Sequence, residues 1–260
     1  MGRLTGKNAI ITGGNRGIGL AIALAYAKEG ADIAFSYNTH EEEAKAVVQE
    51  IQQLGRKAIA IKADISNEKE REALAQQAIE FLGVCHILVN NAGVYFRQDY
   101  LDVSEQDYDT MMNINLKGAF FFTQFIVRHM QWQQVPGCVI NISSFRDQAP
   151  TAGLATYQIG KVGLTMFSDT LAIELAKYGI RFNTISPGMV ETNMLTDKIE
   201  KDSPQWQERI DAVPLKRPGR AEEVADTAVY LATSEYSTGT RIVIDGGRRF
   251  SPLGMLPSKL

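Results

Sequence analysis

The chain has 260 residues and 45% hydrophobic content, which is enough to bury the core of one α/β domain spanning residues 1–260. Its formal net charge of −3 excludes an electrostatic basis for binding nucleic acid or an anionic membrane. The longest apolar runs, such as residues 119–122, are far too short to span a bilayer, and no signal-peptide pattern is present, so we expect a cytoplasmic protein.

Short apolar runs alternate with helix-length segments along the chain. Strands are predicted near residues 8–12, 32–36, 57–61, 86–90, 137–142, 180–185 and 241–244, with helices in the intervals. Repeated strand–helix units favour a doubly wound, mostly parallel sheet of about seven strands, with helices on both faces and right-handed crossovers. No repeat, low-complexity tract or Pro/Gly-rich linker divides the chain. The pattern therefore predicts a single α/β domain.

A glycine-rich segment follows the first predicted strand. Residues 12–19 read Thr-Gly-Gly-Asn-Arg-Gly-Ile-Gly, and a helix-like stretch follows at residues 20–27. Between a strand and a helix, such glycines let the backbone approach a pyrophosphate at the N-terminus of the helix. The motif predicts a dinucleotide site that contains Gly13, Asn15, Arg16, Gly17, Ile18 and Gly19.

The end of the second predicted strand bears on the choice of cofactor. An acidic side chain there would bind the ribose 2′-hydroxyl of NAD and repel a 2′-phosphate. The chain instead has the non-acidic residues Ser36, Tyr37, Asn38 and Thr39 at this position. The guanidinium of Arg16 could pair with a phosphate, so NADP(H) is the preferred cofactor. NAD remains possible, because Asn38 does not supply a second positive charge.

The cysteines and histidines do not indicate a metal site. Cys85 and Cys138 each precede an apolar run, and two isolated cysteines in such a chain are expected to be reduced core residues. His40, His86 and His129 are scattered without the spacing of metal ligands. No metal is expected.

Tyr157 and Lys161 are four residues apart and would share one face of a helix, where the ammonium can approach the phenol oxygen. A nearby cation favours the phenolate, and a tyrosine pKa near 10 must fall by roughly three units, about 4 kcal/mol, for half ionisation at neutral pH. Ser144, thirteen residues upstream of the tyrosine, could hydrogen-bond the same oxygen. These residues suit proton transfer to or from a carbonyl/alcohol couple. The alternative for the pair alone is a solvated helix face.

With these motifs in order, the chain resembles the short-chain dehydrogenases/reductases over residues 4 to about 247. The matching marks are residues 12–19, Asp64, residues 90–93, Asn115, Ser144, Tyr157 with Lys161, residues 187–188 and residues 245–247. The resemblance implies a Rossmann fold. It also implies a catalytic tetrad in which Tyr157 is the acid/base, Lys161 lowers its pKa and holds the nicotinamide ribose, Ser144 orients the substrate, and Asn115 anchors a water relay.

The same resemblance extends the expected cofactor site beyond the glycine loop. The further cofactor-binding residues that it implies are Asp64, Ile65, Asn91, Ala92, Gly93, Tyr157, Lys161, Pro187, Gly188, Val190 and Thr192. Thr192 matches the residue that lies near the nicotinamide carboxamide. A non-catalytic dinucleotide-binding scaffold is the remote alternative, but such proteins usually lose a tetrad member and all four are present.

The substrate is left open by the sequence. Residues 188–219 break the strand–helix rhythm and carry apolar side chains between polar ones, which favours a substrate lid; a short helical excursion packed on the core is the alternative. Arg146, Asp147 and Gln148 suit a sugar or polyol. In contrast, an apolar ketone or acyl chain suits the aromatic and methionine side chains Phe96, Phe145, Met189 and Trp206. The chain is similar both to glucose 1-dehydrogenases, which would make it an NAD-using or dual-cofactor sugar dehydrogenase, and to 3-oxoacyl-carrier-protein reductases.

The resemblance also suggests a homotetramer, with residues 104–131 and 154–178 forming one helical interface. The predicted second apolar face consists of Phe120, Phe121, Phe122, Phe125 and Ile126, which exceed what one buried stripe needs. The C-terminal tail, residues 248–260, extends past the usual end of the family and could cross to a neighbouring subunit.

Overall fold

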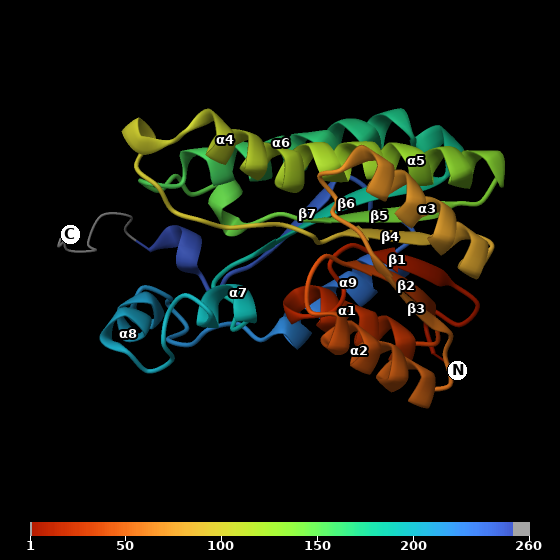
Figure 1. Ribbon diagram of the computed structural model, residues 1–260, viewed down its shortest axis with the longest axis horizontal. Helices are drawn as coiled ribbons and strands as arrows, with labels where there is room; N and C mark the ends of the chain where they lie inside the picture. The colour runs from red at the N-terminus through yellow and green to blue at the C-terminus, as the bar shows by residue number, and fades with distance from the viewer. Residues whose placement is uncertain (1, 252–260) are drawn as a thin grey trace.

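The computed structural model of the chain describes residues 2–251, so most of the predicted tail, residues 252–260, lies outside the described residues. One parallel sheet has the strand order β3-β2-β1-β4-β5-β6-β7 (Figure 1). The strands are β1 (Asn8–Ile11), β2 (Asp32–Tyr37), β3 (Ala58–Lys62), β4 (Ile87–Asn90), β5 (Gly137–Ile142), β6 (Ile180–Pro187) and β7 (Thr240–Ile244). All neighbouring strands are parallel, which confirms the predicted doubly wound sheet of seven strands.

Helices cover both faces of this sheet (Figure 1). One layer contains α1 (Gly17–Lys28), α2 (Glu41–Gln53) and α9 (Ala221–Thr233). The other contains α3 (Glu68–Leu82), α4 (Glu105–Met112), α5 (Ala119–Trp132) and α6 (Ala155–Glu174). The short helices α7 (Asn193–Thr196) and α8 (Pro204–Asp211) stand apart from both layers, near the ends of the later strands (Figure 1).

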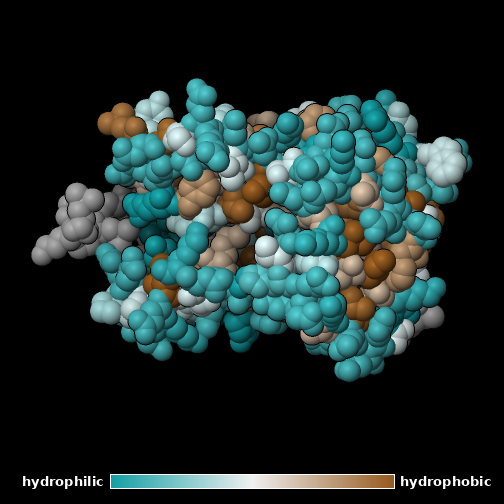
Figure 2. All heavy atoms as spheres, in the orientation of Figure 1, coloured by the Kyte–Doolittle hydropathy of each residue, from teal (hydrophilic) through white to brown (hydrophobic). Residues whose placement is uncertain are grey.

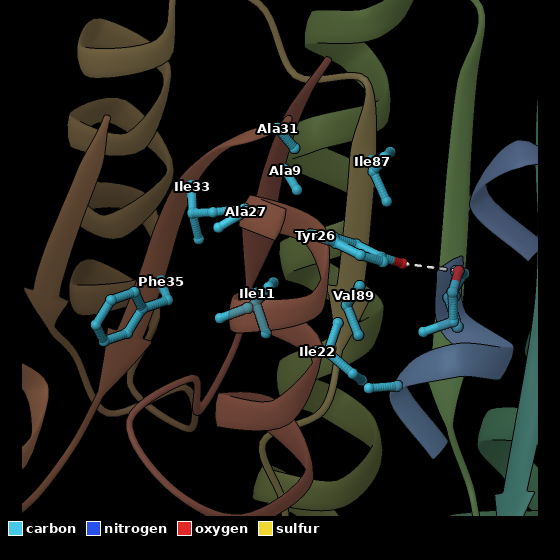
Figure 3. Packing of buried hydrophobic residues seen from close by; sticks show 14 of the residues in the cluster. Ala9, Ile11, Ile22, Tyr26, Ala27, Ala31, Ile33, Phe35, Ile87 and Val89 are labelled. Atoms are coloured by element: carbon cyan, nitrogen blue, oxygen red, sulfur yellow. Dashed lines mark hydrogen bonds between the residues drawn. The ribbon is translucent and has the colours of Figure 1, made fainter. Parts of the chain in front are cut away.

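The inner strands are buried on both faces, so their side chains pack into two separate hydrophobic cores. Ile11 of β1 packs in the cluster beneath α1 and α9, whereas its neighbour Ile10 packs in the cluster beneath α3 and α5. Tyr26 of α1 lies fully buried in the first cluster and donates its hydroxyl hydrogen to the Ala228 carbonyl of α9 at 3.1 Å (Figure 3). This bond joins α1, the helix that follows the glycine loop, to α9.

The helix predicted across residues 104–131 is interrupted by a π-helical turn at Asn113–Gly118, η2. Asn115 lies in this turn and is 1% exposed; its Oδ1 accepts from the Val94 N–H at 2.9 Å, and its Nδ2 donates to the Val94 carbonyl at 3.0 Å. A π-turn adds a residue to the helix and re-aims the side chains beside it. Here it places the Asn115 amide against the loop that follows β4.

The strand order reverses at β1 and β4, and in such sheets ligands bind beyond the carboxyl ends of the strands at the reversal. The face in Figure 2 is mainly hydrophilic, with hydrophobic side chains visible chiefly between the two rows of helices. Within residues 2–251, no helix combines the length and apolarity needed to cross a membrane. Over the same residues, no group of three or more His, Cys, Asp or Glu side chains is arranged to hold a metal ion.

Candidate active site

A cleft of about 2110 Å³ lies beyond the carboxyl ends of the strands. Nearly all of the predicted site residues line it. They are Gly13, Asn15, Arg16, Gly17, Ile18, Ser36, Tyr37, Asn38, Thr39, Asp64, Ile65, Asn91, Ala92, Gly93, Ser144, Tyr157, Lys161, Pro187, Gly188, Val190 and Thr192. The two exceptions, Gly19 and Asn115, are buried behind the wall and support it.

The loop between β1 and α1 requires glycine at three positions. Gly13 and Gly17 have φ values of +67° and +59°, where a side chain would be strained. A Cβ added to Gly19 would lie 2.1 Å from the Gly13 carbonyl oxygen, so only glycine fits this turn. No side chain of residues 2–251 caps α1 at its N-cap residue, Arg16. The first N–H groups of α1 therefore remain available to an anion such as a pyrophosphate.

Asn91, after β4, holds the glycine loop in place. Its Nδ2 donates to the carbonyl oxygens of Thr12 at 3.0 Å and Gly13 at 2.9 Å. On the other side, the Ser36 hydroxyl oxygen accepts from the Gly13 N–H at 3.1 Å. Ser36 is 3% exposed, so its hydroxyl supports the loop as well as bordering the cleft.

Arg16 lies at the end of the cleft beside β2, but its guanidinium already has partners. Its Nη2 donates to the Asp197 carboxylate at 2.9 Å, and its Nη1 lies 2.8 Å from His40 Nε2. Asp197 follows α7, in the segment that the sequence indicates as a lid. Arg16 therefore also holds the 188–219 segment against the glycine loop, and its pairing with a cofactor phosphate stays a prediction.

Tyr157 and Lys161 project from α6 toward Ser144, which follows β5, at the floor of the cleft. The Lys161 ammonium donates to the Ile142 carbonyl at 2.9 Å and lies 5.9 Å from the centre of the Tyr157 ring. The Tyr95 ring stands edge-on to the Tyr157 ring at 5.2 Å. A Cβ added to Gly93 would meet Asn115 Oδ1 at 2.9 Å and Lys161 Nζ at 3.5 Å. The four predicted tetrad residues therefore converge on one place.

Burial is the largest cause of the pKa shifts of Tyr157 and Lys161. It raises the pKa of Tyr157 to about 12, although the Ser144 hydroxyl acts in the opposite direction. Burial likewise lowers the pKa of Lys161 to about 8, opposed by the negative charge of Asp147. In this arrangement the pKa of the phenol is raised, unlike the lowering that the sequence predicts, because burial outweighs the contributions of Ser144 and Arg146 that favour the phenolate.

The sequence interpretation groups Asp147 with residues that face the substrate, but Asp147 does not line the cleft. Its Oδ2 accepts hydrogen bonds from Ser143 at 2.9 Å, Thr165 at 2.9 Å and Ser186 at 2.8 Å, beneath the cleft. Three hydroxyl donors, from the residue after β5, from α6 and from β6, turn the carboxylate inward. Of the three polar residues grouped together, only Arg146 lines the cleft.

The 188–219 segment is a closed excursion with a small core of its own. Its two ends meet where the Glu191 N–H donates to the Gly219 carbonyl at 2.9 Å and the Gly219 N–H donates to the Met189 carbonyl at 2.8 Å. Trp206 is 3% exposed and packs with Ile199 and Ile210. Trp206 and Phe96 are absent from the cleft lining, so two of the four side chains expected to favour an apolar substrate do not border it.

Residues 13–249 match the family model described as enoyl-(acyl carrier protein) reductase. Glucose 1-dehydrogenase 2 of Bacillus subtilis is 35% identical over 96% of this chain and 97% of its own length. L-rhamnose 1-dehydrogenase (NADP(+)) of Thermoplasma acidophilum is 36% identical over 93% and 96%. A short chain dehydrogenase from Burkholderia cenocepacia, solved in complex with NADP, is 33% identical, with a TM-score of 0.87 over 95% of this chain and 99% of that one.

Proposed function

Because the chain belongs to the short-chain dehydrogenase/reductase family and is thus an NAD(P)-dependent oxidoreductase, we propose that it transfers hydride between NADP(H) and a carbonyl or secondary alcohol. The observation that carries this proposal is the convergence of Tyr157, Lys161 and Ser144 on the floor of the cleft that also contains the glycine loop. A proton donor, a cation and a hydroxyl at one point are what a carbonyl oxygen needs as it gains or loses charge.

The chain's own residues handle the proton. The nicotinamide, when bound, supplies or accepts the hydride. Tyr157 donates its phenolic proton to the oxygen during reduction and removes a proton from the alcohol during oxidation, while Ser144 hydrogen-bonds the same oxygen. Lys161 places a buried positive charge 5.9 Å from the centre of the Tyr157 ring, and with its own pKa at about 8 it is mostly protonated at neutral pH.

The cofactor preference is supported by the charges at the end of β2. Residues 36–39 contain no carboxylate that would repel a 2′-phosphate, and Arg16 borders the same part of the cleft. A phosphate there would share or replace Asp197 as the partner of the guanidinium. NADP(H) is therefore the preferred cofactor, and use of NAD(H) as well is the alternative.

Arg16→Ala is expected to raise the KM for NADP(H) by about 10- to 100-fold and to change the KM for NAD(H) little, because a charge-assisted hydrogen bond to a phosphate is worth roughly 1.5–3 kcal/mol. Steady-state kinetics with both cofactors measures this. Asp197→Asn is the matched variant: it removes the competing carboxylate and should lower the KM for NADP(H). Equal effects of Arg16→Ala on the two cofactors would remove the phosphate assignment.

A sugar substrate is the second candidate. Both sequence relatives reported above are named as dehydrogenases of sugars, glucose and L-rhamnose. Phe96 and Trp206, which were expected to favour an apolar ketone, do not line the cleft, and this also supports a sugar over such a ketone. A non-catalytic scaffold has the least support, because all four tetrad residues are present and lie together.

The 188–219 segment acts in this proposal as a lid over the substrate. It touches both ends of the site, through Asp197 to Arg16 and through the Lys198 ammonium to the Tyr95 carbonyl. Met189 and Met194 on the segment line the cleft. Excluding water there would protect hydride transfer.

Binding of NADP(H) with a substrate analogue is expected to slow hydrogen exchange across residues 190–215, because closure would bury their backbone amides. Hydrogen-exchange mass spectrometry of free and bound protein measures the change, and the core strand β5 serves as the internal control. Protection that is complete in the free protein, or unchanged on binding, would make the segment a fixed wall.

Assembly as a homotetramer is proposed through α5 and α6. Their outward apolar residues are Phe120, Phe121, Ile159, Val162, Met166 and Ile173, which are 40–84% exposed. The predicted face is corrected in part, because Phe122 and Ile126 are buried in the sheet-side cluster and Phe125 packs against it. Outward side chains from α6 take their place. An apolar surface of this kind on two adjacent helices is typical of a subunit interface.

Multi-angle light scattering is expected to show a tetramer at micromolar concentration. Met166→Glu should dissociate it, because burying an unpaired carboxylate at an apolar interface is strongly unfavourable. Tyr236→Glu, at a fully exposed site outside α5 and α6, controls for the added charge alone. A monomeric wild-type protein at that concentration would contradict the assembly.

A further inference from the structure

Four arginines gather at the substrate end of the cleft, each from a different part of the chain. Arg97 follows β4, Arg146 lies in the 3-10 turn after β5, Arg209 lies in α8 and Arg248 follows β7. All four line the cleft. Segments far apart in the sequence therefore bring guanidinium groups to one place in a chain whose net charge is negative.

Arg146 is held next to the predicted catalytic serine. Its backbone N–H donates to the Ser144 hydroxyl oxygen at 3.2 Å. Its guanidinium lies 4.4 Å from the centre of the Phe145 ring and donates to the Thr151 hydroxyl. These contacts hold the positive charge beside the reacting site, away from the glycine loop at which a cofactor pyrophosphate would lie.

The arginines repel one another. Burial, followed by the charges of Arg248, Arg209 and Arg97, lowers the pKa of Arg146 to about 10, with Tyr95 acting in the opposite direction. Arg248 is 8% exposed, and burial and Arg209 lower its pKa, although Asp245 opposes them. Like charges in a partly desolvated site are unfavourable unless an anion joins them.

Within residues 2–251, no carboxylate forms an ion pair with this cluster. None of the four guanidinium groups lies within 4.0 Å of a described carboxylate. The buried Nη1 of Arg248 has no hydrogen-bond partner among those residues. Asp99 and Glu208 line the same cleft outside ion-pair distance, and the Asp245 carboxylate accepts from the Gly247 and Arg249 N–H groups. A buried donor without a partner needs an explanation, and a bound anion would supply the acceptor.

We propose that the substrate of this site is an anionic carbonyl compound or alcohol, whose carboxylate or phosphate group binds between Arg146, Arg248 and the neighbouring guanidiniums. The inference rests on the function proposed above and adds the substrate class to it. Arginine is the side chain best suited to such oxyanions, because its planar fork makes two parallel charge-assisted hydrogen bonds. The remainder of the substrate lies toward Ser144 and Tyr157.

The experiment compares substrate pairs that differ in the anionic group. Reduction with NADPH is measured for acetoacetate and methyl acetoacetate, and oxidation with NADP for glucose 6-phosphate, glucuronate and glucose. The first pair tests a carboxylate on a short chain, and the second set separates a phosphate from a carboxylate on a sugar. The anionic member of at least one set is expected to have a kcat/KM about 10- to 100-fold higher than its neutral counterpart.

Variants connect this preference to the arginines. Arg146→Met and Arg248→Met should each lower kcat/KM for the anionic member by about 10- to 100-fold and lower it much less for the neutral member, so that the ratio between the two falls. Arg146→Lys keeps the charge and should retain part of the preference. Arg3→Met, at an exposed arginine outside the cleft lining, is the matched control and should alter neither substrate. The inference would be overturned if neutral and anionic members had equal kcat/KM values and the variants lowered both equally. That result would leave the proposed function in place.

Binding of malonate gives a measurement that does not depend on turnover. Calorimetric titration of the protein with NADP bound should show malonate binding that Arg146→Met and Arg248→Met weaken and Arg3→Met does not. Absence of malonate binding, together with equal turnover of charged and neutral compounds, would contradict the anion site. Malonate binding with no turnover of any compound would instead count against the proposed function and support the anion site by itself.

Discussion

Tyr157→Phe is expected to lower kcat by about 100- to 10,000-fold, the usual contribution of a general acid–base, and to leave the affinity for NADP(H) nearly unchanged. The substitution removes only the hydroxyl, which acts on the reacting oxygen. The buried ring and its edge-on contact with Tyr95 at 5.2 Å are retained. Steady-state kinetics and fluorescence titration of NADPH separate the two effects.

Tyr26→Phe is the matched control for this experiment. It removes a buried tyrosine hydroxyl that donates to Ala228 and lies away from the cleft. We expect a loss of about 1 kcal/mol in the free energy of unfolding without a change in kcat. Near-normal turnover by Tyr157→Phe would end the proposed mechanism, since no other residue is assigned the proton.

Lys161→Met is expected to lower kcat by orders of magnitude and to weaken NADP(H) binding, because the ammonium is assigned both the stabilisation of the phenolate and contact with the ribose. The same substitution should stabilise the free protein at neutral pH. Burial lowers the pKa of Lys161 from 10.5 to about 8, so the charged form costs roughly 3 kcal/mol in the folded state.

The pH dependence of that gain follows from the two pKa values. Below about pH 8 the lysine is protonated in both states and the folded protein bears the full cost of burial. Between about 8 and 10.5 the unfolded chain binds more protons than the folded one, so the stability of the wild type rises with pH. The advantage of Lys161→Met should therefore be largest below pH 8 and shrink as pH rises. Denaturant unfolding of both proteins measures it, and a difference independent of pH would contradict the buried charge.

The sequence predicts the sheet and the glycine loop well because both depend on local patterns. Apolar runs between turn residues locate all seven strands to within about two residues, and positive φ angles at Gly13 and Gly17 follow from the loop that the motif specifies. The sequence also predicts that Ser144 and Tyr157 lie close together, because both match motif positions of the short-chain dehydrogenases/reductases.

Features that depend on long-range packing could not be predicted from the sequence. Asp147 turns inward because hydroxyls of three separate elements meet beneath it, and the pairing of Arg16 with Asp197 joins residues 181 positions apart. Trp206 is drawn into the core of its own segment by Ile199 and Ile210. The arginine cluster was missed for the same reason, since its members are scattered from residue 97 to residue 248.

Transfer of deuterium from labelled NADPH to the product measures the proposed hydride transfer itself. The protein is incubated with a reactive carbonyl compound from the substrate sets above and NADPH that carries deuterium at the reactive nicotinamide carbon, and the alcohol product is analysed by mass spectrometry. The mechanism predicts deuterium on the carbinol carbon with the wild type and almost no product with Tyr157→Phe at saturating NADPH. A carbinol hydrogen derived from solvent, or equal product formation by Tyr157→Phe, would contradict it.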